Sequence, residues 1–114
     1  MRRLALILTS SAMFAAASAQ ADPAPVTVAL MLKDHRFLPE TVTVPAGKRI
    51  RVELTNQDGA MEEFDSEDLH IEKDVTPYGK VAFELGPLQP GNYSFMGELH
   101  ADTASGELRA VAPE

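Results

Sequence analysis

An imidazole near the C-terminal end of the chain, His100, is the residue best suited to chemistry. It ends the stretch GNYSFMGELH that begins at Gly91. Two carboxylates, Glu98 and Asp102, lie within two positions of it, and Met96 adds a thioether. All three side-chain types bind metals, the imidazole and carboxylate favouring harder ions and the thioether favouring copper(I). The pattern predicts a metal site around His100, with Glu98 and Asp102 as oxygen donors or as acceptors that orient the imidazole.

A second group of candidate ligands lies near the middle of the chain, where five carboxylates fall between positions 62 and 68. Carboxylates supply hard oxygen ligands for a cation, and the candidates in this stretch are Glu62, Glu63 and His70. Met61 precedes this run and pairs with Met96 as a possible thioether donor, although methionines more often fill irregular gaps in a core. The alternative for the carboxylates is a solvated acidic loop. The sequence leaves open whether His70 or His35 joins the site.

Composition narrows the chemistry further. The 114 residues include no cysteine, which excludes thiolate metal sites and cysteine-based catalysis. The formal charge of −7 makes nucleic acid and anionic lipid poor partners and cations good ones. Ser94 and Ser105 lie in no nucleophile motif, so a hydrolase is not expected.

The N-terminal residues predict export. A basic start at Arg2 and Arg3 is followed by an apolar, alanine-rich run and by the small-x-small signal that ends at Ala21. This is the pattern of a secretory signal peptide, with cleavage after Ala21. Cleavage would leave 93 residues with eight basic and 17 acidic side chains, a formal charge of about −9, in one domain.

Alternating apolar residues predict strands over most of the remaining chain. The clearest runs lie at residues 26–33, 42–44, 50–54, 81–85, 93–95 and 108–111, with further strands expected through Phe64 and around 69–71. Turn residues such as Pro45, Gly47, Gly59 and Gly91 separate them. No segment has sustained helical periodicity. The fold class predicted is therefore an all-β sandwich.

Three stretches resemble cupredoxin domains: HRFLP at residues 35–39, VTVPAG at 42–47, and LQPGNYSF at 88–95. The resemblance covers nearly all of the chain after the signal peptide. It implies a Greek-key β-sandwich over residues 26–114, preceded by a flexible leader at 22–25. In electron-transfer cupredoxins, histidines are expected at the positions of Glu62 and His100 and a cysteine at that of Gly97. The resemblance therefore implies Glu62 and His100 as the main ligands, while the loss of the first histidine and of the cysteine means that type 1 blue copper is not expected.

The stretch NQDGAMEEFD at residues 56–65 is most similar to EfeO-type cupredoxin-like domains, including the FtrB-like proteins of bacterial iron uptake. This resemblance implies a periplasmic protein that binds copper, iron or both and assists ferrous-iron uptake. It would bind metal, relay electrons or oxidise iron(II) beside an inner-membrane iron permease and a companion iron-binding protein. The sequence leaves open whether the protein forms a homodimer. The alternative is a docking module that kept the cupredoxin fold without a metal.

Overall fold

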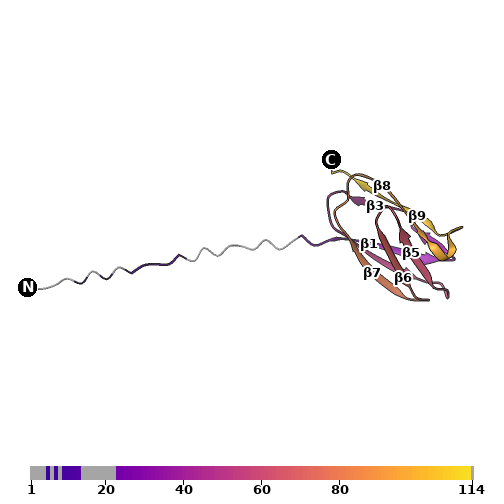
Figure 1. The fold of residues 1–114 in the computed structure, drawn as a ribbon, viewed down its shortest axis with the longest axis horizontal. Helices are drawn as coiled ribbons and strands as arrows, with labels where there is room; N and C mark the ends of the chain where they lie inside the picture. The colour runs from indigo at the N-terminus through magenta and orange to yellow at the C-terminus, as the bar shows by residue number, and fades with distance from the viewer. Residues whose placement is uncertain (1–4, 6, 8, 14–22, 114) are drawn as a thin grey trace, which may run out of the picture.

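The computed structural model describes residues 5, 7, 9–13 and 23–113, and within them the chain forms two β-sheets (Figure 1). One sheet has the strand order β2-β1-β4-β7 and the other β3-β9-β8-β5-β6. The strands are β1 (Val26–Lys33), β2 (Arg36–Leu38), β3 (Thr41–Pro45), β4 (Ile50–Asn56), β5 (Glu62–Ser66), β6 (Ile71–Val75), β7 (Lys80–Leu85), β8 (Gly91–Gly97) and β9 (Ser105–Val111). The predicted all-β sandwich is confirmed.

The strands form where apolar residues alternate with polar ones. In β4, Ile50, Val52 and Leu54 are buried, while the residues between them face outward or lie at intermediate depth. Successive side chains of a strand point to opposite faces of the sheet, so this spacing directs one face into the core. Both sheets contribute such a face, and together they enclose a single apolar core.

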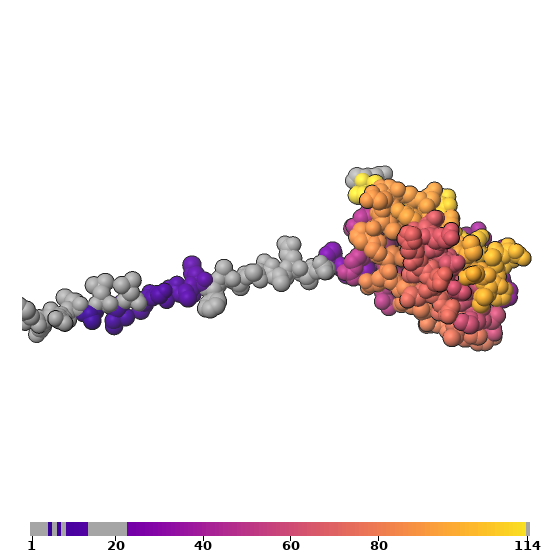
Figure 2. Space-filling view, viewed as in Figure 1, coloured from indigo at the N-terminus to yellow at the C-terminus, as the bar shows by residue number. Residues whose placement is uncertain are grey.

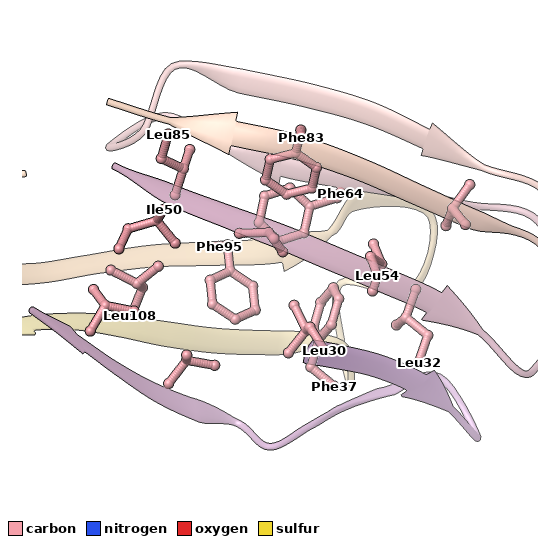
Figure 3. Close-up of a cluster of buried hydrophobic side chains, with 14 of the residues drawn as sticks. Leu30, Leu32, Phe37, Ile50, Leu54, Phe64, Phe83, Leu85, Phe95 and Leu108 are labelled. Atoms are coloured by element: carbon pink, nitrogen blue, oxygen red, sulfur yellow. The ribbon is translucent and has the colours of Figure 1, made fainter. Parts of the chain in front are cut away.

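Four phenylalanines lie at the centre of that core (Figure 3). The ring of Phe64 is 4.9 Å from that of Phe83 and 5.1 Å from that of Phe95, measured between centroids. Phe37 meets Phe95 edge-on at 5.0 Å and is fully buried. Edge-to-face and offset rings are the preferred aromatic arrangements, so this cluster joins the two sheets firmly.

The strand topology brings three chain segments to one end of the sandwich. β1 and β4 are parallel neighbours, with Leu32 opposite Asn56, so the turn after β1 and the loop after β4 leave the sheet together. The segment after β8, which contains a single 3₁₀ turn (η1, Glu98–His100), lies at the same end. It protrudes in orange and yellow, opposite the end at which residues 23–25 enter the domain (Figure 2).

Some local predictions were wrong. The strand expected around residues 69–71 is a turn, because His70 has a positive φ of 55°, and β6 begins only at Ile71. β2 was not predicted, since its three residues are too short to show alternation. Among the described residues η1 is the only helical element.

The predicted cleavage site after Ala21 lies outside the described residues, as do most residues of the predicted signal peptide. No helix in the described ranges is long and apolar enough to cross a membrane.

Replacing Phe37 with alanine should destabilise the protein by about 3–5 kcal/mol, because it removes a fully buried ring that anchors the short strand β2. Urea unfolding measures the change. Val111→Ala is the control: this side chain is 48% exposed at a strand end, and the loss there should stay under about 1 kcal/mol. Equal losses at the two positions would contradict the described core.

Candidate functional site

The two strongest ligand candidates from the sequence, His100 and Glu62, lie in direct contact. Nδ1 of His100 is 2.6 Å from Oε2 of Glu62. The Glu62 side chain is only 4% exposed, and its other oxygen, Oε1, accepts the backbone amides of Glu63 at 3.0 Å and Leu99 at 2.9 Å. Because a carboxylate only accepts hydrogen bonds, Nδ1 of His100 is the donor in this pair. Nε2 of His100 is left without the proton when the ring is neutral.

Gly97 makes room for the Glu62 carboxylate. A Cβ atom built on Gly97 would lie 2.6 Å from Cδ of Glu62, 2.8 Å from its Oε2 and 2.8 Å from Cβ of Ala104. Such distances are far below van der Waals contact. The carboxylate therefore occupies the space that any side chain at position 97 would need. A thiolate at this position and the buried Glu62 carboxylate exclude each other.

His35, which sequence reasoning placed outside the two ligand loops, stacks on His100. The two imidazole rings are 3.8 Å apart and inclined by only 11°. His35 arrives there because the turn after β1 leaves the sheet at the same end as the loop before Glu62. The signal that could have revealed it is the parallel pairing of β1 with β4, which the apolar pattern alone does not give.

The backbone of His35 is held from two sides. Its amide donates to Oδ2 of Asp58 at 2.9 Å, and the amide of Asp34 donates to Oδ1 at 2.8 Å. Its carbonyl accepts the hydroxyl of Thr103 at 2.6 Å. The β4–β5 loop and the segment after His100 are thus both tied to the β1–β2 turn.

Asp58 is itself fixed by the buried Asn56. Oδ1 of Asn56 accepts the amide of Asp58 at 2.9 Å, and Nδ2 donates to the carbonyls of Ala60 and Thr76. Partial burial alone would raise the pKa of Asp58, but the hydrogen bonds from the His35 and Asp34 amides and the nearby imidazoles lower it below the ordinary value. The lowered pKa favours the charged form of Asp58, which is the form that accepts both amides of the turn.

Glu63 and Glu98 belong to a separate acidic cluster. Glu63 faces Asp74 across the β5–β6 pair, and Glu98 and Glu72 lie nearby. Partial burial, followed by the charges of Glu98, Glu72 and Asp74, raises the pKa of Glu63. Glu98 thus interacts with Glu63. The hydrogen bonds described for the His100 ring run to Glu62 alone.

The remaining predicted ligands are dispersed. Met96 is 43% exposed and lies on the outer face of β8, between the buried residues Phe95 and Gly97. Met61 and Asp102 are exposed, and no hydrogen bond or ion pair joins either to His100 within the described residues. The ligand roles of Met61, Met96 and Asp102 stay predictions. His70 occupies the turn at the opposite end of β5 from Glu62, so the structure separates it from the His100–Glu62 pair.

The arrangement does not fit a blue-copper centre, which takes a thiolate and two imidazoles. It does contain donors for a harder ion, since an imidazole and a carboxylate already meet. In the described part of the chain, however, no three histidine, aspartate or glutamate side chains converge on one point. The stacked rings of His35 and His100 cannot share an ion as they lie, because an imidazole binds metal in its own plane.

Gly97→Ala should destabilise the protein by about 1–3 kcal/mol, because the added methyl group displaces Glu62 or Ala104. Its φ of −90° suits any residue, so the cost comes from contact alone. Gly86→Ala is the control, since a Cβ there meets nothing within 4 Å. Chemical unfolding should show part of the Gly97→Ala cost disappearing when Glu62 is also alanine. Additive effects would contradict the proposed competition for space.

Glu63→Gln should raise the melting temperature at pH 7. A raised folded-state pKa means that the charged form is disfavoured in the folded protein, so stability falls as pH rises through this range. The gain should vanish below about pH 4, where the glutamate is protonated folded or unfolded. Thermal melts from pH 3 to 8 measure it, with Glu40→Gln as an exposed control. A gain that persisted unchanged in acid would exclude the electrostatic cause.

Solved structures with the same fold include two that bind copper. Auracyanin A, a "blue" copper protein from Chloroflexus aurantiacus, superposes with a TM-score of 0.66 at 14% identity, covering 77% of this chain and all of that one. The metal-binding domain of the Cu(I)-exporting P-type ATPase CopA of Streptococcus pneumoniae D39 gives 0.64 at 11% identity, covering 75% and 84%. At such low identity these likenesses show the fold alone.

Sequence comparison defines the family. An uncharacterized protein of Rickettsia prowazekii (strain Madrid E), RP394, is 46% identical over 79 residues, which are 69% of this chain and 63% of that protein. This chain thus spans less than two thirds of the relative's length. The model of the cupredoxin-like domain family matches residues 4–110. The chain therefore belongs to the cupredoxin-like domain family, in a form without cysteine.

Proposed function

We propose that this protein is an exported metal-binding protein that takes up copper(II) or iron(II) through His100 and Glu62. The observation that carries the proposal is the contact between these two side chains, an imidazole nitrogen 2.6 Å from a buried carboxylate oxygen. Both side chains lie in segments in which the cupredoxin resemblance expects metal ligands. Copper proteins occur among the solved structures with the same fold, which is compatible with a metal-binding role.

The donor types select the kind of ion. Without a thiolate, a nitrogen and oxygen set suits copper(II), iron or manganese better than copper(I). The steric competition at Gly97 reinforces this selection, because the carboxylate that supplies the oxygen also blocks a sulfur ligand from that position.

Metal uptake at this pair requires the Nδ1 proton of His100 to move. Nδ1 now donates a hydrogen to Glu62, and an ion held by both groups would take the place of that hydrogen while the proton passes through solvent to Nε2 of the neutral ring. Two donors on one ion lie about 3 Å apart, because each bond is about 2 Å long, so the pair must open slightly from its present 2.6 Å. Binding should weaken in acid, because an imidazolium carries a proton on both nitrogens and has no lone pair for the ion.

The biological setting that we propose is ferrous-iron uptake in the periplasm, beside an inner-membrane iron permease and a companion iron-binding protein. It rests on the resemblance of residues 56–65 to EfeO-type and FtrB-like proteins. A carboxylate-rich site favours iron(III) over iron(II), which would promote oxidation. A single site stores no electrons, so oxidation of iron(II) would pass its electron to an external acceptor. Binding and electron relay are the simpler roles.

One observation favours a second candidate, a docking module without metal. The Glu62 carboxylate already accepts three hydrogen bonds within the protein, so the fold satisfies it with no ion present. Such a module would use the acidic surface to bind a basic partner.

Anaerobic calorimetric titration with copper(II) and with iron(II) separates the two functions. We expect one ion per protein, with at least about tenfold weaker binding in His100→Ala, which removes a ligand. His70→Ala is the matched control, since His70 lies at the far end of β5 and should not matter. Absence of binding to the wild type would support the docking module. Binding that survives His100→Ala would place the ion elsewhere.

A further inference from the structure

We infer that His35 is the third metal donor of this site, completing a set of two imidazoles and one carboxylate with His100 and Glu62. The inference rests on the proposed metal-binding function and adds a ligand that lies outside both ligand loops of the cupredoxin resemblance. Three features of His35 support it: the conformation of its backbone, the hydrogen bonds that hold that backbone, and a ring without a hydrogen bond in the described residues.

The backbone of His35 has a conformation in which glycine is more stable than histidine. Asp34 and His35 both have positive φ, at 52° and 56°, in the turn between the antiparallel strands β1 and β2. A two-residue hairpin turn of this kind prefers glycine at the second position, because a side chain there is strained. Histidine is among the residues that tolerate this conformation, and here the turn holds its imidazole beside that of His100.

The surrounding loops fix the base of His35. Asp58 accepts its amide and Thr103 donates to its carbonyl, so the residue is tied to the segments before Glu62 and after His100. These are the two segments that carry the other donors. The three donors therefore share one hydrogen-bonded support, which keeps their Cα positions fixed relative to one another.

The ring of His35, by contrast, makes no hydrogen bond within the described residues. The side chain is 44% exposed, and its Nδ1 lies 3.7 Å from Oδ2 of Asp58, which is too long for a hydrogen bond. The ring stacks on that of His100. Rotation about the side-chain bonds can direct a nitrogen toward the ion, without movement of the backbone.

Two imidazoles and one carboxylate form a recognised donor set. Non-haem iron(II) sites use it on one face of the ion and leave the other positions open for water or substrate. Copper(II) also accepts nitrogen and oxygen donors of this kind. A set with open positions suits a protein that receives an ion and passes it on. His35 thus supplies the third donor that the His100–Glu62 pair lacks.

Two substitutions distinguish the two roles that His35 could have: a metal donor, or a ring that only shields His100 from solvent. His35→Gly removes the ring and relieves the backbone strain, so the metal-free protein should melt no lower than the wild type. His35→Phe keeps an aromatic face over His100 and removes both nitrogens. His70→Gly is the matched control, because His70 is also exposed with a positive φ of 55°.

Titration with iron(II) under anaerobic conditions and with copper(II) should show affinities reduced at least about tenfold in both His35 variants and unchanged in His70→Gly. Nitrogen hyperfine structure in the electron paramagnetic resonance spectrum of the copper(II) form should indicate two imidazoles in the wild type and one in His35→Phe. Wild-type affinity in His35→Phe would overturn the inference while leaving the proposed function intact. A wild-type protein that binds neither ion would overturn both.

Discussion

A buried carboxylate needs hydrogen-bond donors, and at Glu62 the fold provides three. Two are backbone amides, of Glu63 and Leu99, and the third is Nδ1 of His100. Since Leu99 and His100 belong to the segment after β8, satisfying this one side chain draws that segment onto the start of β5. The geometry at the end of the sandwich follows from this constraint. Gly97 must lack a side chain, and His100 must present its Nδ1 edge inward.

The changes at the two expected copper-ligand positions are therefore physically coupled. The Glu62 carboxylate occupies the space that a cysteine side chain at position 97 would need. Glycine, which has no side chain, leaves that space free for the carboxylate. Independent loss of ligands would not produce such a fit. The site is better described as rebuilt around a carboxylate–imidazole pair, with the aromatic core of the cupredoxin fold left intact beneath it.

Much of this arrangement could be predicted from the sequence, for reasons visible in particular residues. Alternation in β4 and β7 is a local signal, and it identified the strands. The candidates Glu62 and His100 came from the resemblance of their segments to cupredoxin domains. The position of His35 beside His100 depends on the parallel pairing of β1 with β4, which joins residues more than twenty positions apart and leaves no local pattern. His70 was misplaced in a strand because its apolar neighbours imitate alternation, whereas its positive φ makes it a turn residue.

The hydrogen bond from His100 to Glu62 is tested most directly by finding which ring nitrogen of His100 carries the hydrogen in the metal-free protein. Long-range ¹H–¹⁵N correlation spectra, recorded at a pH where the imidazole is neutral, distinguish a protonated Nδ1 from a protonated Nε2. In the wild type the hydrogen should be on Nδ1. In Glu62→Ala it should leave that position, because the acceptor is gone. Hydrogen on Nε2 in the wild type would show that Glu62 does not accept from His100, and would contradict the central claim.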